Sequence, residues 1–322
     1  MISLVWVYVL AGLTFAAFSV FSATDAENPK RFRNAAFWGL LAVSFLFGQW
    51  LGDLGNGLLL IALVAIAGVG GLGQGRPATT TPEERMGHAM RFGGRLFLPA
   101  LIIPTTALLG TLVLAKVRIG DTPLFDPKDP TLIALGLGVV LALSTAMAMF
   151  RPPATAPLQE GRRLMDSVGW AAILPQMLAA LGAVFALAGV GQVVGGLMSD
   201  VVPMTGPLIA VATYCLGMAL FTVIMGNAFA AFPVMTAAIA LPFVIHQFGG
   251  NPAIVCAIGM LSGFCGTLLT PMAANFNVVP ANLLDLPDRN AAFNGVIRAQ
   301  APTALVLLVA NMALMYFLAF RF

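Results

Sequence analysis

Long apolar tracts and short polar loops alternate along the whole chain. A helix of about 20 consecutive apolar residues is long enough to cross the hydrocarbon core of a bilayer. Nearly uncharged tracts of that order recur at 2–22, 34–51, 55–74, 96–115, 131–150, 168–190, 206–248, 252–286 and 296–320. The pattern predicts an all-α integral membrane protein with about eight transmembrane helices.

The tract at 206–248 departs from this pattern, because it is too long for one span and short for two spans with a loop between them. Gly226-Asn227-Ala228 lies at its middle, and Pro233 and Pro242 follow. A helix that simply crosses a membrane has no need of a buried carboxamide, and proline interrupts its hydrogen-bond ladder. We therefore predict a re-entrant helical hairpin over 206–248, with its tip at Gly226-Asn227-Ala228.

A second interruption lies in the tract at 252–286, which we predict to be a broken helix. Thr270-Pro271 stops one half-helix, Asn275 and Asn277 lie in the gap, and Val278 onward resumes. The two amide-bearing interruptions are separated by an intact apolar helix and form a pair. Half-helices that end within the membrane bind substrate and coupling ion in many secondary transporters.

Each interruption offers backbone groups to a ligand. Unpaired carbonyls at a helix C-terminus attract a cation, and amide N–H groups at a helix N-terminus attract an anion. The substrate-binding residues predicted on this basis are Gly226, Asn227, Ala228, Asn275 and Asn277. Two alternatives stay open: Asn227 as a hydrogen-bonding residue between packed helices, and Asn275 and Asn277 as caps of helix ends.

Composition supports the membrane class. The chain is 59% hydrophobic and only 9% charged, with a mean hydropathy of +0.94. A soluble domain needs far more charge to cover its surface. The net charge of +3 belongs to loops between spans rather than to a nucleic-acid surface. The three cysteines have no metal-site spacing, and they are interpreted as small packing residues.

The basic residues set an orientation, because Lys and Arg concentrate in cytoplasmic loops. With the N-terminus outside, and with 206–248 returning to the side it came from, twelve of the sixteen Lys and Arg residues face the cytoplasm. A single full crossing at 206–248 would move Arg289 and Arg298 outside. We therefore expect an external N-terminus and an external turn at 248–252.

The second half resembles the C-terminal repeat of the ion-transporter superfamily, best seen in the divalent-anion/sodium symporters. The order of features is a hairpin with an Asn tip, an apolar return helix, a Gly-Asn-Pro turn at 250–252, and a helix broken at Pro271 and Asn277. Where that family has Ser and Thr beside the tip Asn, this chain has Gly226 and Ala228.

This resemblance implies a cation site, with Thr222 placed five residues before Asn227, where that family has a sodium-ligand Thr. A bound Na⁺ is therefore expected at Thr222 and Asn227. The residues that the resemblance assigns to the cation site are Thr222, Asn227, Thr270, Ala274 and Asn275.

The whole chain is similar to a bacterial family catalogued as a domain of unknown function. The similarity rests on the stretches "NPKRFRNAAFWGLLAVSFLFG", "GRPATTTPEER" and "NAFAAFPVMTAAI". It implies one subunit of a two-gene permease in the bacterial inner (cytoplasmic) membrane. It also implies a smaller membrane protein as partner and pyroglutamate (5-oxoproline) as substrate.

The first half of the chain contains no second Asn-tipped hairpin, whereas transporters of this kind build their site between two inverted repeats. We therefore expect residues 1–166 to be membrane helices that serve as scaffold and contact the partner, and 167–322 to be the transport repeat. The expected function is import of a small carboxylate by a two-component secondary transporter in the lipid bilayer. The coupling ion is Na⁺ or H⁺, no other cofactor is expected, and a dimer of this chain remains an alternative.

Other functions are less consistent with the sequence. A membrane-embedded enzyme needs acid–base groups at depth, and neither a His-Glu-x-x-His motif nor a nucleophile elbow is present. We therefore expect no enzymatic activity. A non-transporting structural subunit of a membrane complex is the remaining alternative. His88 lies in a charged loop and is interpreted as a surface side chain.

Overall fold

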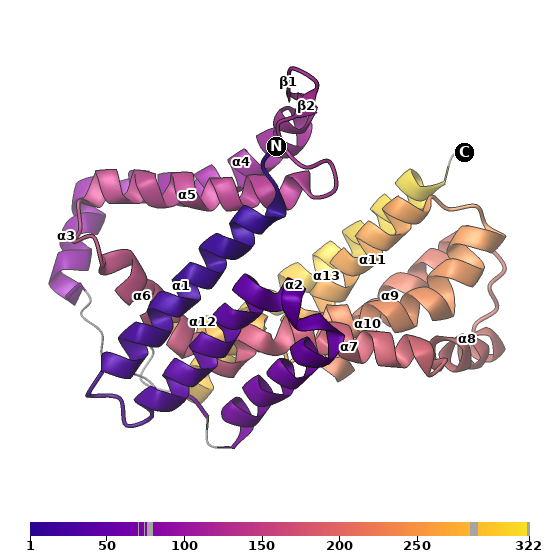
Figure 1. The fold of residues 1–322 in the computed structure, drawn as a ribbon. Helices are drawn as coiled ribbons and strands as arrows, with labels where there is room; N and C mark the ends of the chain where they lie inside the picture. The colour runs from indigo at the N-terminus through magenta and orange to yellow at the C-terminus, as the bar shows by residue number, and fades with distance from the viewer. Residues whose placement is uncertain (70, 74, 76–79, 284–288, 321–322) are drawn as a thin grey trace. The chain divides into compact units, whose positions relative to one another are not determined.

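A computed structural model describes residues 1–69, 71–73, 75, 80–283 and 289–320. The chain forms two compact units, unit 1 from Met1 to Gly169 and unit 2 from Trp170 to Phe322. Figure 1 shows that helices make up most of both units.

Unit 1 is built mainly from four long helices and two shorter ones. The long helices are α1 (Leu4–Thr24), α2 (Arg31–Gly68), α4 (Leu98–Leu112) and α5 (Pro130–Phe150). The shorter helices are α3 (Pro82–Phe92) and α6 (Ala156–Val168). Two 3₁₀ turns, η1 (Gly93–Phe97) and η2 (Leu114–Lys116), and a ribbon of β1 (Arg118–Ile119) and β2 (Thr122–Pro123) complete the unit.

α1 and α2 pack against each other as antiparallel helices. The Phe15 ring of α1 stacks on Trp38 of α2, with centroids 5.7 Å apart and planes 8° apart. α2 bends at Gly52, which has φ 62° and ψ −178° inside the helix. Asn56 Nδ2 donates to the carbonyls of Gly48 and Gly52 at 2.8 and 2.9 Å. These side-chain bonds replace backbone hydrogen bonds that the bend interrupts. The turn expected between 34–51 and 55–74 therefore lies here, where two helical segments of α2 meet at Gly52 without a separate loop.

α4 and α5 pack closely through small residues. Gly138 of α5 lies so near α4 that a Cβ there would be 3.1 Å from the Ile103 carbonyl oxygen. Thr111 and Thr131 hydrogen-bond across the pair at 2.9 Å. The β1–β2 ribbon follows α4, and the next residues bind the start of the chain, with Ile2 N–H donating to the Leu124 carbonyl at 2.8 Å.

Unit 2 holds the two interruptions predicted from the sequence. It begins with η3 (Gly169–Ile173), which starts at the unit boundary, α7 (Leu174–Leu187) and α8 (Val190–Val201). It continues with α9 (Pro207–Met225), α10 (Ala228–Met235), η4 (Thr236–Gln247) and α11 (Pro252–Leu269). It ends with η5 (Ala274–Val278), α12 (Val279–Leu283) and α13 (Arg289–Ala319).

α9 and the α10–η4 segment form an antiparallel hairpin with a tight tip. Tyr214 of α9 and Thr236 at the start of η4 meet through their hydroxyl oxygens, 3.0 Å apart. Gly217 of α9 similarly lies beside Met235. The limbs span 19 and 20 residues, about 28–30 Å at the rise of an α-helix. The chain therefore goes out and back within 207–247, and each limb is long enough to cross a membrane.

The prolines of the return limb change the type of helix without ending it. Pro233 lies inside α10 and Pro242 lies inside η4. Proline cannot donate the usual backbone bond and crowds the preceding turn. The chain takes the wider π-helical form over Thr236–Gln247, and Phe248 N–H accordingly donates to the Phe243 carbonyl five residues earlier, at 3.0 Å.

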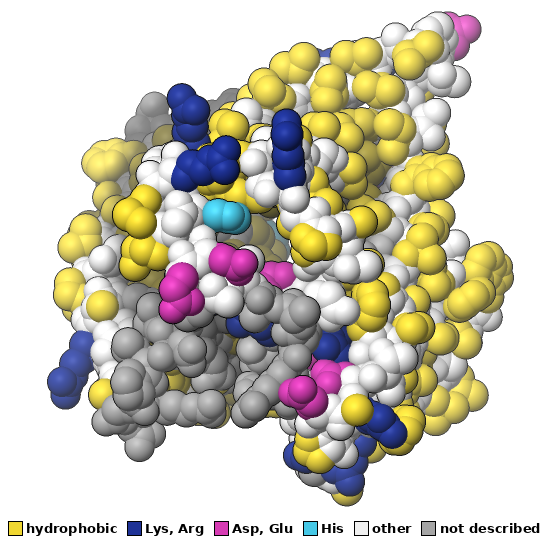
Figure 2. All heavy atoms as spheres, turned by 90° about the vertical axis from the view of Figure 1, so that its left-hand side faces the viewer, with side chains coloured by type: hydrophobic (Ala, Val, Ile, Leu, Met, Phe, Trp, Pro, Cys, Tyr) yellow, Lys and Arg dark blue, Asp and Glu magenta, His cyan; other side chains and the backbone are white. Residues whose placement is uncertain are grey.

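The chain is a multi-pass helical membrane protein. Among the described residues, eight helical segments are long and apolar enough to span a membrane. They are Leu4–Thr24, Arg31–Gly68, Glu83–Lys116, Pro130–Phe150, Pro207–Met225, Ala228–Gln247, Pro252–Leu269 and Ala291–Ala319. Leu54, Val69 and Leu187 expose 78%, 79% and 90% of their surface, which suits contact with lipid rather than water. On the face shown in Figure 2, hydrophobic side chains cover wide areas and charged ones gather in patches.

One expected span differs from the structure. The tract at 168–190 was predicted to cross the membrane as a single helix. Instead, Ala180–Leu187 and Val190–Met198 form a pair bent by 68°. The cause is Gly189, whose φ of 68° cannot continue a right-handed helix. Sequence hydropathy does not register such a bend, because the residues on both sides are apolar.

Candidate functional site

The hairpin tip consists of two residues with complementary roles. Gly226 ends α9 in the left-handed conformation, with φ 77° and ψ −2°, and its N–H donates to the Thr222 carbonyl at 2.7 Å. Asn227 is extended and begins α10, with its Oδ1 accepting the Phe229 N–H at 2.8 Å. Gly is favoured at a helix C-cap and Asn at an N-cap. The Gly-Asn pair therefore reverses the chain without any further loop residue.

The tip packs directly against the second interruption. A Cβ on Gly226 would lie 2.7 Å from Met272 Cβ and 3.0 Å from the Met272 carbonyl oxygen. The backbone of the tip can approach Met272 only because residue 226 has no side chain. The two interruptions, in contact through Gly226 and Met272, which are 46 positions apart in the sequence, thus form one structural feature.

The second interruption is held by hydrogen bonds from two buried side chains. α11 ends at Leu269, and Thr270 is extended. Thr270 Oγ1 donates to the Val223 carbonyl of α9 at 2.8 Å. Asn277 Nδ2 donates to the carbonyls of Thr267 and Thr270 at 2.9 and 2.7 Å. The C-terminal ends of α9 and α11 are therefore linked side by side.

α9 and α11 run parallel to each other, which brings their C-termini to the same level. The residue numbers of the contacting pairs increase in the same direction along both helices. Gly259 lies against Tyr214, Gly263 against Met218 and Gly266 against Thr222. A Cβ on Gly266 would lie 2.9 Å from Thr222 Cβ. Two parallel helix C-termini place the negative ends of two helix dipoles together.

Two buried oxygen atoms at these interruptions have no hydrogen-bond partner within the described part of the chain. They are Thr222 Oγ1 and Asn277 Oδ1, and both residues are completely buried. The Thr222 hydroxyl faces α11, since a Cβ on Gly263 would be 3.4 Å from it. Buried polar atoms almost always have partners. A water molecule or a bound cation is the kind of partner that would satisfy these two oxygens.

The structure brings most of the sequence-predicted site residues to this place. Thr222, Gly226, Asn227 and Ala228 form the end of α9 and the start of α10, and Thr270 and Asn277 flank the second interruption. Ala274 and Asn275 open η5, but their side chains lie outside the described part of the structure. Asn277 does cap a helix end, as its alternative interpretation proposes. Asn227 caps the start of its own helix, α10, whereas its alternative interpretation is a hydrogen bond between packed helices. Capping occupies Asn227 Oδ1 and Asn277 Nδ2, and Asn277 Oδ1 has no hydrogen-bond partner among the residues that the structure describes.

Sequence reasoning missed an aromatic group beside the tip. Phe229 of α10 meets Phe264 of α11 with ring centroids 5.9 Å apart, and Phe264 meets Phe276 of η5 at 5.8 Å. Gln300 of α13 also reaches this region, with Nε2 donating to the Phe276 carbonyl at 3.4 Å. These residues come from four elements, so no spacing in the sequence relates them.

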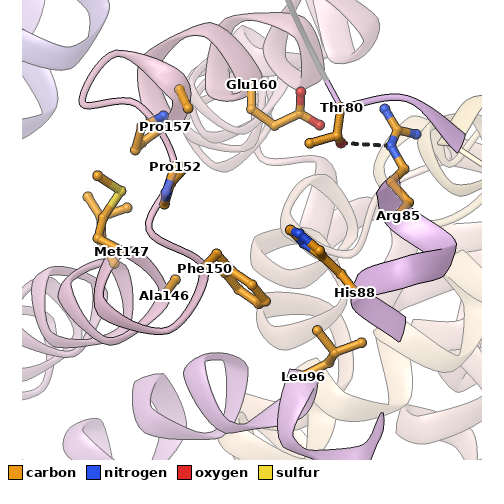
Figure 3. Close-up of a pocket in the computed structure, with 12 residues that line it drawn as sticks. Thr80, Arg85, His88, Leu96, Ala146, Met147, Phe150, Pro152, Pro157 and Glu160 are labelled. Carbon is orange, nitrogen blue, oxygen red and sulfur yellow. Dashed lines mark hydrogen bonds between the residues drawn. The ribbon is translucent and has the colours of Figure 1, made fainter. Parts of the chain in front are cut away.

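A separate pocket lies in unit 1 (Figure 3). Its volume is about 490 Å³, and none of the predicted site residues lines it. Leu96, Met147 and Phe150 form an apolar wall, and Arg85 and Glu160 supply charge. His88, interpreted as a surface side chain, lines this pocket and stacks on Phe150 with centroids 5.6 Å apart. His88 is partly exposed, which agrees with that interpretation, and it also contributes to the pocket wall.

The chemistry of the two interruptions is that of neutral oxygen and amide groups. Residues 222–228 and 267–278 include no Asp, Glu, Lys, Arg or His. The arrangement offers carbonyls and hydroxyls to a cation and backbone amides at the start of α10 to an anion. It offers no described group for acid–base chemistry.

Comparison with known proteins gives a family without an assigned activity. No curated protein and no solved structure matches the chain. A family model described as "Protein of unknown function (DUF979)" matches residues 5–320, which is nearly the whole chain. The protein therefore belongs to the DUF979 family.

Proposed function

We propose that this chain is one subunit of a two-component secondary active transporter that imports a small carboxylate. Pyroglutamate is the first candidate substrate, and Na⁺ or H⁺ is the coupling ion. The observation that carries the proposal is the meeting of two helix interruptions, where Gly226 packs on Met272 and Thr270 binds the α9 terminus. Secondary transporters use such interruptions to bind substrate and ion.

The cation site would lie at the parallel C-termini of α9 and α11. Thr222 Oγ1 is fully buried without a partner there, and the last carbonyls of a helix carry partial negative charge. Thr270 and the backbone of Ala274 and Asn275 are the other proposed contributors. An oxygen set of this kind suits Na⁺, because hydroxyl and carbonyl oxygens replace its water ligands.

The carboxylate site would lie at the start of α10. Amide N–H groups of Ala228 and its neighbours and the Asn227 carboxamide can donate to a carboxylate. No cationic side chain belongs to either interruption. The charge of the substrate is therefore offset by the helix dipole and by the coupling cation, which makes the two binding events interdependent.

We also propose that the hairpin is re-entrant, that the N-terminus is outside, and that the membrane is the bacterial inner membrane. The antiparallel hairpin supports the orientation, because the chain returns to the side it came from. The buried Gly226 backbone supports a tip within protein rather than at a free surface. The overall arrangement would then resemble one repeat of the ion-transporter superfamily.

The test is uptake of labelled pyroglutamate by this chain together with its proposed smaller membrane partner, with and without a sodium gradient. Asn227→Ala should slow uptake about tenfold or more while leaving protein levels near normal, since one hydrogen bond to a charged ligand is lost. Asn227→Asp should be slower still, because it sets a carboxylate against the substrate. Wild-type uptake by Asn227→Ala would overturn the site assignment.

The Thr222 hydroxyl gives a second, separate arm of this test. Thr222→Val should raise the cation concentration needed for half-maximal uptake, because it removes an oxygen ligand without changing shape. Thr267→Val is the matched control, since its buried hydroxyl already donates to the Phe264 carbonyl at 2.6 Å. If both variants keep the wild-type cation dependence, Thr222 is not a cation ligand.

A further inference from the structure

Unit 1 contains a buried charged centre that the proposed function does not use. Arg162 of α6 pairs with Asp25 at the end of α1 at 2.9 Å, and their side chains are 3% and 8% exposed. Arg162 Nη1 also donates to the Phe21 carbonyl at 2.7 Å. α6 lies beside α1 in the same unit (Figure 1). Arg162 is thus bound to the C-terminal end of α1 by an ion pair and by a hydrogen bond.

A second carboxylate, Asp166, lies one turn further along α6 and is 6% exposed. Its Oδ1 accepts two hydrogen bonds, from Asn34 Nδ2 at 3.0 Å and from Trp38 Nε1 at 2.9 Å. Its Oδ2 is buried and has no partner within the described residues. A carboxylate normally binds partners through both oxygens. The unpaired Oδ2 is the position that a proton would occupy.

The charges around Asp166 do not balance if it is ionised. Arg162 lowers its pKa and Asp25 raises it, while the neutral donors Trp38 and Asn34 lower it. Burial is the largest influence and raises the pKa above its ordinary value. Among the other charged residues of these elements, Arg163 and Glu160 pair with each other at 2.6 Å, and Lys30 lies in the turn between α1 and α2.

Other buried polar atoms on α1, on α6 and in the turn between α1 and α2 have no hydrogen-bond partner among the described residues. They are Ser22 Oγ, Asn28 Nδ2, Gln159 Oε1 and Arg162 Nε. The backbone of Gly73 and Gly75 closes over the centre: Asn34 exchanges hydrogen bonds of 2.7 and 2.9 Å with Gly73, and a Cβ on Gly75 would overlap Asp25. Unpaired buried donors and acceptors of this kind are the usual partners of buried water, which would connect Asp166 to a proton supply.

We propose that this centre is a proton-binding site, in which Asp166 takes up one proton from water on Oδ2 and releases it again. Arg162 stays paired with Asp25 in both states. The protonated centre has one positive and one negative charge, and release of the proton leaves a second buried negative charge beside them. That charge competes for Arg162 and weakens the attachment of α6 to α1. The site lies in unit 1 and does not depend on the proposed transport function.

The proton itself can be observed by infrared difference spectroscopy of the purified full chain. A protonated carboxyl gives a C=O stretching band that the ionised form lacks. We expect a band that persists at pH values where exposed carboxyls are ionised, and that disappears in Asp166→Asn. Glu160→Gln, an acid on the same helix that is paired with Arg163, is the matched control and should keep the band. Absence of the band in the wild type, or its survival in Asp166→Asn, would overturn the proposal.

Trp38→Phe tests the same site when Asp166→Asn fails to accumulate. The substitution removes one donor that favours the ionised carboxylate, so the midpoint of the band should move to higher pH. A purely structural role for Asp166 would leave no titrating band to move. A midpoint equal to that of the wild type would contradict the proposal.

Thermal unfolding gives a readout independent of spectroscopy. A carboxyl whose pKa is raised in the folded state stabilises the protein fully at pH values below its unfolded-state pKa of about 3.9. That stabilisation is lost as the pH rises through the folded-state pKa. The wild type should therefore lose stability across that window, and Asp166→Asn should lose less. Equal pH profiles for the two proteins would count against the site.

Discussion

At the scale of single residues, Gly226 carries two demands that no other residue type meets. Its φ of 77° lies in the left-handed region, which costs about 1–3 kcal/mol for a residue with a side chain. Its position against Met272 also leaves no room for a Cβ. Gly249 has almost the same φ, 74°, but an added Cβ there meets nothing within 4 Å. A comparison of substitutions at the two glycines therefore separates the cost of backbone strain from the cost of the close contact with Met272.

We therefore predict that Gly226→Ala lowers the thermal unfolding midpoint more than Gly249→Ala does. Both variants share the backbone strain, and only the first forces the tip away from Met272, at an additional cost on the order of 1–3 kcal/mol. Unfolding followed in detergent checks the comparison. Equal losses would show that the tip can move off Met272 freely, and would remove the structural basis for a shared site.

At the residue scale, the sequence predicts a structural feature when the cause of that feature lies in neighbouring residues. Gly-Asn inside an apolar tract signals a reversal, and the structure places the turn there. The Asp166 centre has no such signal, because its partners Asn34 and Trp38 are 132 and 128 residues away. In the sequence, Asn34 and Trp38 belong to one apolar tract and Asp166 precedes another, and only the fold shows that they share hydrogen bonds.

At the scale of elements, the parallel contact of α9 and α11 sets the site's geometry. α11 presents Gly259, Gly263 and Gly266 to α9, and small residues let helices in membranes approach closely. Close approach is what allows Thr270 Oγ1 to reach the Val223 carbonyl. A larger separation of the helices would break that bond and part the two C-termini.

Gly266→Ala should destabilise the protein and weaken cation dependence together. Its Cβ would lie 2.9 Å from Thr222 Cβ and would also overlap the Ala219 backbone carbonyl, which cannot move like a flexible side chain. Gly295→Ala on α13 is the control, because its Cβ meets nothing within 4 Å. Replacing a helix glycine by alanine in open space stabilises by roughly 0.5–1 kcal/mol. Thermal unfolding of both variants distinguishes them, and a stabilised Gly266→Ala would contradict the packing described.

Element boundaries are predictable where proline or glycine marks them. Pro207 and Pro252 occupy the first turns of α9 and α11, as the fixed φ of proline favours. Within the tract at 206–248, Gly226 and Asn227 reverse the chain without a separate loop, which leaves room for limbs of 19 and 20 residues. The π-helical form of η4 and the bend at Gly189 lie within apolar sequence, so hydropathy does not register them.

At the scale of the whole molecule, the hairpin fixes which loops share a side of the membrane. Because α9 and α10–η4 run antiparallel, residues 202–206 and 248–252 lie on one side. Neither stretch contains Lys or Arg, which favours the external side. We predict that a single cysteine at Gln247 or Gly249 reacts with a membrane-impermeant reagent added outside intact cells. Reaction only after the membrane is opened would reverse the proposed orientation.

The last prediction concerns the chain's dependence on a partner. Transporters with paired helix interruptions place the site between two related repeats. Unit 2 supplies one pair of interruptions that meet, whereas the described part of unit 1 shows an isolated one, the Gly52 bend capped by Asn56. One side of the proposed substrate site would therefore come from another chain.

Purified protein reconstituted alone should bind lipid and remain folded, yet take up no pyroglutamate above empty vesicles. Vesicles that contain both this chain and the smaller membrane partner should take it up. Retention of the cooperative unfolding transition in the lone chain is the control that excludes simple denaturation. Uptake by the lone chain at the rate of the pair would show that a second copy of this chain, rather than a different protein, completes the site. In that case the two interruptions of unit 2 would face their counterparts across a twofold axis, and a cysteine at Met272 would be the first position to test for a cross-link between copies.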